Sequence, residues 1–142
     1  MTLRQSIQDS LAATCAGCDS LLVTGHSLGG ALAVLSTLDL AAEIPAGMRI
    51  EVCTFAGPRA GCVDFSRSFQ EKISVCYRVV ATADIVPHIP LPAPDLPYEH
   101  VGAEIHIDEG SVTNPVTAHR LDLSYKPGLE RLQKLLAQRA AA

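Results

Sequence analysis

Hydrophobic positions change their spacing repeatedly along the 142 residues, and each change predicts a new element of secondary structure. Leu3, Ile7 and Leu11 recur at the four-residue spacing of an amphipathic helix. The apolar run at 21–24 is short and continuous, as in a strand buried in a parallel sheet. The same analysis predicts helices at 3–15, 28–42 and 63–71 and around 129–136, and strands at 21–24, 49–55, 73–80 and 101–107.

Single residues add two helix boundaries and one loop. Thr2 followed by Gln5 fits a capping box at the start of the first helix. The segment 28–42 is rich in alanine and leucine, which predicts a buried helix that ends before Pro45. Residues 81–98 contain five prolines, a density that predicts a stiff, extended loop without a helix.

Strands that alternate with helices predict an α/β fold built on a mostly parallel sheet. Apolar and polar residues alternate along 101–107, so this last strand should be half exposed. No internal repeat or linker interrupts the pattern, and we therefore expect one domain over residues 1–142.

Composition and charge narrow the class of protein. With 48% apolar and 18% charged residues, the chain fits a folded globular protein. The net charge of −4 and the scattered basic residues argue against nucleic acid as a partner. No apolar run approaches the ~20 residues that a membrane helix needs, and the first ten residues lack the apolar core of a secretory signal. As written, the chain is expected in the cytoplasm, while an N-terminal truncation would keep secretion open.

The cysteines predict neither a disulfide framework nor a metal site. Their number, five, is odd, which favours reduced thiols. Cys15 and Cys18 form one C-x-x-C pair, but a zinc or redox site needs further ligands or a βαβ setting after the pair. Thiols that pack against the helix are the favoured interpretation, and no metal or cofactor is predicted.

The sequence GHSLG at 25–29 matches G-x-S-x-G between a predicted strand and a predicted helix, the setting of a nucleophile elbow. Such a sharp turn forces strained backbone dihedrals on Ser27, while Gly25 and Gly29 let the two elements approach closely. The hydroxyl would stand at the amino end of the helix, where developing negative charge is favoured. Ser27 is therefore the candidate nucleophile, and the main-chain N–H of Leu28 is a candidate oxyanion donor.

A serine nucleophile needs a histidine base and a carboxylate that orients the base. On this kind of sheet the chain order is serine, acid, histidine, with the last two on loops after later strands. Asp84 follows the strand that ends at residue 80 and is the candidate acid, with a turn or cap role as the alternative. His119 lies beyond the last predicted strand and is the candidate base.

The other four histidines are expected to play different parts. His26, next to the nucleophile, should point away from it and pack or hydrogen-bond locally. His88, in the proline-rich loop, would line the cleft. His100 and His106 should share the polar face of the last strand with Glu104, and a solvated edge strand is favoured there over a metal site.

Five blocks of the sequence resemble the class 3 lipase family, which includes the fungal triacylglycerol lipases and plant phospholipase A1-type enzymes. The resemblance covers nearly the whole chain, in the family's order, and matches the C-terminal half of the family. The blocks are VTGHSLGGALA at 23–33, TFAGPRAGC at 54–62, YRVVATADIVPHIP at 77–90, YEHVGAEIHI at 98–107 and AHRLDLSY at 118–125.

The resemblance implies an α/β-hydrolase fold and the hydrolysis of carboxylic esters, mostly in acylglycerols. It implies Ser27 as nucleophile, Asp84 as acid, His119 as base, the Leu28 amide as half of an oxyanion hole, and a structural role for His100. It also implies that the first sheet strands, the lid and the second oxyanion donor lie outside this sequence. The strand at 21–24 would then be an open edge that a second copy, another chain or a longer natural protein covers. A weak or inactive lipase-like subunit that binds through this edge is the alternative function.

Overall fold

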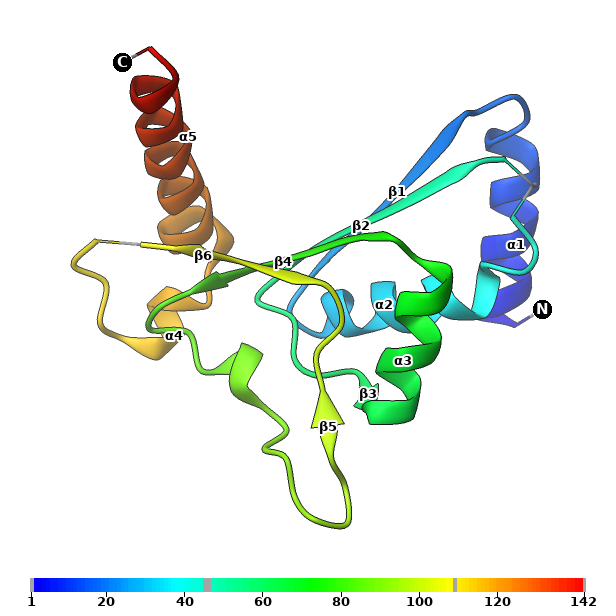
Figure 1. Cartoon of the computed structure of the whole chain (residues 1–142), viewed down its shortest axis with the longest axis horizontal. Helices are drawn as coiled ribbons and strands as arrows, with labels where there is room; N and C mark the ends of the chain where they lie inside the picture. The colour runs from blue at the N-terminus through cyan, green and yellow to red at the C-terminus, as the bar shows by residue number, and fades with distance from the viewer. Residues whose placement is uncertain (1, 45–46, 109, 142) are drawn as a thin grey trace.

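A four-stranded parallel sheet forms the centre of the computed structural model, which describes residues 2–44, 47–108 and 110–141 (Figure 1). Its strands follow the order β1-β2-β4-β6, and all three pairings are parallel. Their bounds are Ser20–His26 for β1, Arg49–Phe55 for β2, Val75–Ala81 for β4 and Ala103–Ile107 for β6. The predicted fold class, a mostly parallel sheet flanked by helices, is confirmed.

Helices cover both faces of the sheet, with α2 (Leu28–Leu40) and α3 (Val63–Lys72) on one face and α5 (Lys126–Ala140) on the other (Figure 1). The first helix, α1 (Leu3–Thr14), lies beside the start of β1. Within the described ranges, no helix is both long and apolar enough to cross a membrane. The smaller elements are the antiparallel pair β3 (Gly61–Cys62) and β5 (Tyr98–Glu99), the 3-10 turn Val86–His88, α4 (Pro115–Ala118) and the π-helical turn Leu121–Tyr125.

The sheet divides the core into two clusters because successive strand residues point to opposite faces. On the α2 and α3 face, Val52 of β2 packs with Phe69 and other buried side chains. On the α5 face, Val79 of β4 packs with Tyr125 and Ile107. The full first cluster is Val34, Val52, Phe69, Ile73, Cys76 and Val101, and the second is Ala56, Val79, Ala81, Ile107 and Tyr125.

Most predicted element bounds agree with the structure to within a few residues, and β2 agrees at both ends. The predicted cap of α1 is present, since the Thr2 side chain accepts a hydrogen bond from the Gln5 main-chain N–H at 3.2 Å. The end of α2 at Leu40 also fits, whereas Pro45, the predicted stop, lies outside the described residues. In the proline-rich loop the prediction of no helix was wrong by one turn, because Pro87 fits the start of the 3-10 turn.

The prediction of a buried helix at 28–42 holds for only one side of α2. Its Gly30, Ala31 and Val34 side is buried, but Leu28, Leu32 and Leu35 are exposed. These leucines share one face of the helix because they lie four and three residues apart. The polar residues on this side, Ser36 and Asp39, are few among the alanines and leucines, so the composition alone favoured burial.

The last strand begins later than predicted, at Ala103, and Val101 is buried in the core before it. His100 therefore does not share a strand face with Glu104 and His106. Its ring is half-buried, and Nε2 lies 2.6 Å from the Pro87 carbonyl oxygen. Gly102, with a φ of 77°, turns the chain between the two positions.

Candidate active site

Ser27 occupies the sharp turn between β1 and α2, with φ 57° and ψ −128°. A non-glycine residue in this conformation costs about 1–3 kcal/mol and persists only where its surroundings hold it. Two main-chain hydrogen bonds do so, from Ser27 N to the Phe55 oxygen and from Gly30 N to the Ser27 oxygen, each at 2.9 Å. The predicted strained turn is thus present at the carboxyl end of the sheet.

Of the two glycines predicted to permit this turn, the structure requires only Gly25. A Cβ at Gly25 would overlap the main chain of Gly29, whereas a Cβ at Gly29 would meet nothing within 4 Å. The close approach belongs instead to Gly30, whose Cβ would come within 3.1 Å of the Gly57 Cα. Gly29 is exposed on α2, and the direction that its Cβ would take leads into open space.

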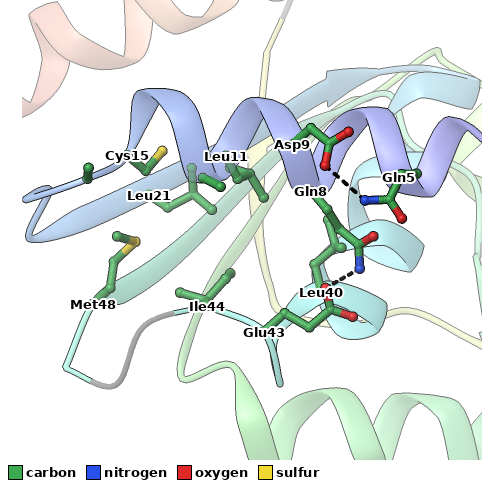
Figure 2. Close-up of a pocket in the computed structure, with 12 residues that line it drawn as sticks. Gln5, Gln8, Asp9, Leu11, Cys15, Leu21, Leu40, Glu43, Ile44 and Met48 are labelled. Atoms are coloured by element: carbon green, nitrogen blue, oxygen red, sulfur yellow. Dashed lines mark hydrogen bonds between the residues drawn. The ribbon is translucent and has the colours of Figure 1, made fainter. Parts of the chain in front are cut away.

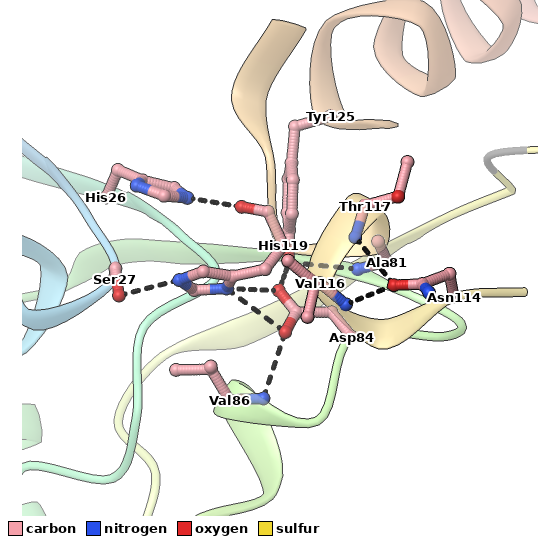
Figure 3. Close-up of polar contacts among 10 residues, drawn as sticks. All are labelled: His26, Ser27, Ala81, Asp84, Val86, Asn114, Val116, Thr117, His119 and Tyr125. Carbon is pink, nitrogen blue, oxygen red and sulfur yellow. Dashed lines mark hydrogen bonds and ion pairs between the residues drawn. The ribbon is translucent and has the colours of Figure 1, made fainter. Parts of the chain in front are cut away.

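The side chains of Ser27, His119 and Asp84 meet in a continuous chain of hydrogen bonds (Figure 3). Nε2 of His119 lies 2.7 Å from Oγ of Ser27, and Nδ1 lies 3.0 Å from Oδ2 of Asp84. A carboxylate only accepts, so the proton of the neutral ring is on Nδ1, and Nε2 accepts from the serine hydroxyl. The structure thus brings together three residues that are 92 and 35 positions apart in the chain.

Asp84 is the most buried of the three, with 1% of its surface exposed. Besides His119, its oxygens accept hydrogen bonds from the main-chain N–H of Val86 at 2.9 Å and from the Tyr125 hydroxyl at 2.6 Å. Several donors are what a buried carboxylate needs to remain charged. The bond to Val86 closes a local turn. Asp84 therefore has the turn role that was the alternative interpretation and also contacts His119.

Two residues contact these hydrogen-bonded side chains in ways that the sequence did not predict, His26 and Tyr125. His26 does not bond locally: its Nε2 lies 2.8 Å from the carbonyl oxygen of His119, and the two rings are 4.8 Å apart (Figure 3). Tyr125, besides reaching Asp84, accepts a bond from Ala81 N and meets the His26 ring edge-on. Neither contact follows a local spacing, and the only sequence signal for the two residues is that each lies in a family block, His26 in 23–33 and Tyr125 in 118–125.

The remaining histidines lie outside this chain of hydrogen bonds. His88 is exposed in the 3-10 turn, and its carbonyl accepts from Arg59. His106 contacts Thr82 at 2.9 Å and Glu104 at 3.3 Å. Among the residues that the structure describes, no three histidine, cysteine, aspartate or glutamate side chains are grouped as a metal ion would require.

The main-chain N–H of Leu28 belongs to the residue that directly follows Ser27. Leu28 is the first residue of α2, and the first N–H groups of a helix have no acceptor within the helix. The partial positive charge at a helix amino end adds to this preference for an anion. These features suit a negatively charged oxygen beside Ser27.

A separate hollow of about 630 Å³ lies between α1, the start of β1 and the end of α2 (Figure 2). Its floor is apolar, with Leu11, Leu21 and Leu40, and its rim carries Gln8 and Glu43. Leu21 is near the amino end of β1, whereas Ser27 follows the carboxyl end. The hollow is therefore not part of the candidate active site.

Comparison with known proteins adds an independent finding. Residues 1–93, which include Ser27 and Asp84, match the family described as lipase (class 3). A lipase of Caenorhabditis elegans is 39% identical over 95 residues, which are 66% of this chain and 27% of that protein. A chloroplastic phospholipase A1 of Arabidopsis thaliana, Igamma2, is 35% identical over 138 residues, covering 82% of this chain and 26% of that protein.

Solved structures agree with these relatives. A triacylglycerol lipase whose catalytic centre is described as a serine protease triad aligns with a TM-score of 0.60 and 31% identity. The alignment covers 74% of this chain and 39% of that chain. This chain thus spans about a quarter of the length of the curated relatives it matches.

Proposed function

Because the chain belongs to the class 3 lipase family, we propose that it hydrolyses carboxylic esters of lipids through Ser27, His119 and Asp84. The observation that carries this proposal is the unbroken chain of hydrogen bonds from the Ser27 hydroxyl through the His119 ring to the buried Asp84. Each member already has the proton arrangement that acyl transfer needs, with a donor hydroxyl, an accepting Nε2 and a carboxylate on Nδ1.

In the proposed reaction, Oγ of Ser27 attacks the ester carbonyl carbon while Nε2 of His119 takes the hydroxyl proton. Collapse of the tetrahedral intermediate breaks the bond to the alcohol, which leaves with the proton that His119 returns. Water, deprotonated by the same ring, then attacks the acyl carbon; the second tetrahedral intermediate releases the carboxylic acid as His119 returns the proton to Oγ of Ser27. Asp84 stabilises the imidazolium that forms twice in this cycle and does not itself become protonated.

The N–H of Leu28 would donate to the oxyanion of both tetrahedral intermediates. It is one donor, and loss of a single oxyanion donor typically costs about 10²–10³ in turnover. The rate of this chain therefore depends on whether a second donor reaches the same oxygen. An active 142-residue chain is expected to turn over slowly if Leu28 acts alone.

The surface around the proposed nucleophile suits an apolar substrate. A large, exposed apolar side chain neighbours each member in the sequence: Leu28 follows Ser27, Ile85 follows Asp84, and Val116 lies in the helix that leads to His119. Their surfaces are 67%, 58% and 77% exposed. Acyl chains of acylglycerols or similar lipid esters would cover this surface, and the relatives named lipase and phospholipase A1 point to the same class.

The substitution Ser27→Ala tests the proposal. It should abolish hydrolysis of a short p-nitrophenyl ester, because no other group supplies the attacking oxygen, while the circular dichroism spectrum stays that of the wild type. Ser36→Ala, on the same helix and away from the site, is the matched control and should retain the wild-type rate. Equal turnover by wild type and Ser27→Ala would end the proposal.

A binding role is the second candidate function. Among the described residues β1 pairs with β2 alone, so its other edge is unpaired, and Leu32 and Leu35 of α2 line one hollow with Val23 of β1. An open strand beside an apolar helix face is a site for association. In this alternative the chain is a weak or inactive subunit that a second copy or another chain completes.

A further inference from the structure

The candidate site contains a histidine that the proposed reaction does not use. His26 is the last residue of β1 and directly precedes Ser27. We propose that His26 is a positioning residue, which holds the imidazole of His119 in line with Ser27 by donating a hydrogen bond to the main-chain carbonyl of His119. The inference rests on the proposed ester hydrolysis and assigns one more residue to it.

Two contacts join His26 to His119. Nε2 of His26 lies 2.8 Å from the His119 carbonyl oxygen, and a carbonyl only accepts, so the proton of the His26 ring is on Nε2. The two rings also pack against each other, 4.8 Å apart and tilted by 37°. Both residues are half-buried, so water competes weakly for this bond. One side chain therefore fixes the main chain of His119 and covers one side of its ring.

His119 needs such an anchor because its own element is short. It caps α4, which has four residues, and its N–H bonds to the Pro115 carbonyl at 3.1 Å. A single helical turn has little stability of its own. The last carbonyls of a helix also have no intrahelical donor, and His26 supplies one for the His119 carbonyl.

The anchor connects the base to the strand that carries the nucleophile. β1 pairs with β2 along its whole length, and His26 itself lies opposite Phe55. Ser27 follows His26 directly, so the distance between Ser27 and His119 is set by one side chain rather than by the 92-residue path between them. Movement of α4 relative to the sheet is thereby opposed at the point where it would separate the two reacting atoms.

Asp84 is held by other groups. The Tyr125 hydroxyl and the Val86 N–H donate to it, and the Tyr125 ring meets the His26 ring edge-on at 6.2 Å. Removing the His26 donor should therefore loosen His119 while Asp84 stays in place. A displacement of about 1 Å in a reacting group costs on the order of 10² in rate, so we expect kcat to fall about 10- to 100-fold.

Two substitutions separate the hydrogen bond from the packing of the ring. His26→Phe keeps a ring against His119 but has no donor, whereas His26→Gln places an amide N–H near the position of Nε2. We expect His26→Phe to lower kcat for a p-nitrophenyl ester with KM within about twofold, and His26→Gln to restore kcat to within about threefold of the wild type. His106→Phe, on β6, is the control and should leave kcat unchanged. If His26→Phe does not fold, His26→Asn, whose amide is too short to reach the carbonyl, takes its place.

The proton resonance of His119 Nδ1–H, measured by NMR, reports the same geometry without any turnover. It should shift upfield or broaden in His26→Phe and stay as in the wild type in His26→Gln. The inference would be overturned by a kcat of His26→Phe within twofold of the wild type. It would also be overturned if both variants lost kcat equally and in step with their melting temperatures. If no Ser27-dependent hydrolysis exists, the proposed function fails, and the Nδ1–H resonance alone tests the positioning role. A resonance that is unchanged in His26→Phe overturns that role. A resonance that is altered in His26→Phe but kept in His26→Gln supports it.

Discussion

At the scale of single residues, Asp84 illustrates how this chain keeps a charge inside the protein. Its oxygens accept hydrogen bonds from a main-chain amide, a phenol and an imidazole, which come from three separate segments. Burial of a carboxylate without such partners is strongly unfavourable. The same bonds that stabilise the charge also orient the His119 ring.

The substitution Asp84→Asn should therefore impair activity far more than folding. An asparagine keeps the size of the side chain but removes the charge and permits the wrong tautomer of His119, so kcat should fall about 10³–10⁴-fold. Stability should fall by about 1–3 kcal/mol, because the NH₂ group of the new side chain replaces an accepting oxygen and faces hydrogen-bond donors. Ester hydrolysis and urea unfolding measure the two effects, with exposed Asp64→Asn as the control. A variant with wild-type kcat would exclude Asp84 as the acid.

The two elbow glycines give a paired test of backbone packing. Gly25→Ala should destabilise the protein by about 1–3 kcal/mol, because its Cβ overlaps the main chain of Gly29. Gly29→Ala should leave stability unchanged or raise it by up to about 1 kcal/mol, because its Cβ enters open space on a helix. Urea denaturation compares the two variants. A similar loss in both would mean that Gly29 packs more tightly than the structure indicates.

The residues that meet at the site differ in how well the sequence predicted them. The G-x-S-x-G motif and the order of the strands were enough to place Ser27, Asp84 and His119 at one edge of the sheet. Tyr125 and the carbonyl contact of His26 were not predicted, because they join positions 41 and 93 residues apart through geometry that no local pattern records. The prediction that Gly29 permits a close approach failed for the same reason, since it depends on what packs against the helix.

At the scale of elements, regular periodicity decided what could be predicted. Clear spacing and end signals mark the first helix, α3 and β2. Each of their predicted ends agrees with the structure to within one residue. The segment 115–125 has no such period. It forms a four-residue helix and a π-helical turn, whose shape is set by the Asn114 cap and by burial of Tyr125.

The contact between His100, just before β6, and Pro87, in the loop after β4, predicts a pH effect on stability. Burial lowers the pKa of His100 from 6.5 to about 4, while its Nε2 contacts the Pro87 carbonyl. Between these two pKa values the unfolded chain binds a proton that the folded chain does not, so stability falls as the pH is lowered from about 6.5 to about 4. His100→Gln, which cannot titrate, should show a smaller fall in urea unfolding across this range. Parallel curves for the two proteins would contradict this account of His100.

At the scale of the whole molecule, the distribution of apolar surface is uneven. Tyr125 and Phe69 are fully buried in the two clusters, while Leu28, Leu32 and Leu35 form an exposed face on α2. Contiguous exposed apolar side chains in folded proteins mark surfaces that associate with other molecules. This face lies on the helix whose first turn borders the proposed nucleophile.

Self-association through this face is the expected consequence. In sedimentation velocity the wild-type chain should form species heavier than a monomer as its concentration rises. Leu32→Glu should remain monomeric, with a free energy of unfolding within about 0.5 kcal/mol of the wild type, because Leu32 is exposed. Leu136→Glu, an exposed position on α5, is the control and should associate like the wild type. A wild-type chain that is monomeric at every concentration would contradict the association.

The reaction of the purified chain with a fluorophosphonate tests most directly whether Ser27 is a nucleophile activated by His119. Mass spectrometry of the digested protein should find one adduct, on Ser27, and His119→Ala should react at least about 10²-fold more slowly, because no base then takes the hydroxyl proton. A folded chain that forms no adduct on Ser27, or that reacts there equally fast without the imidazole, would contradict the account.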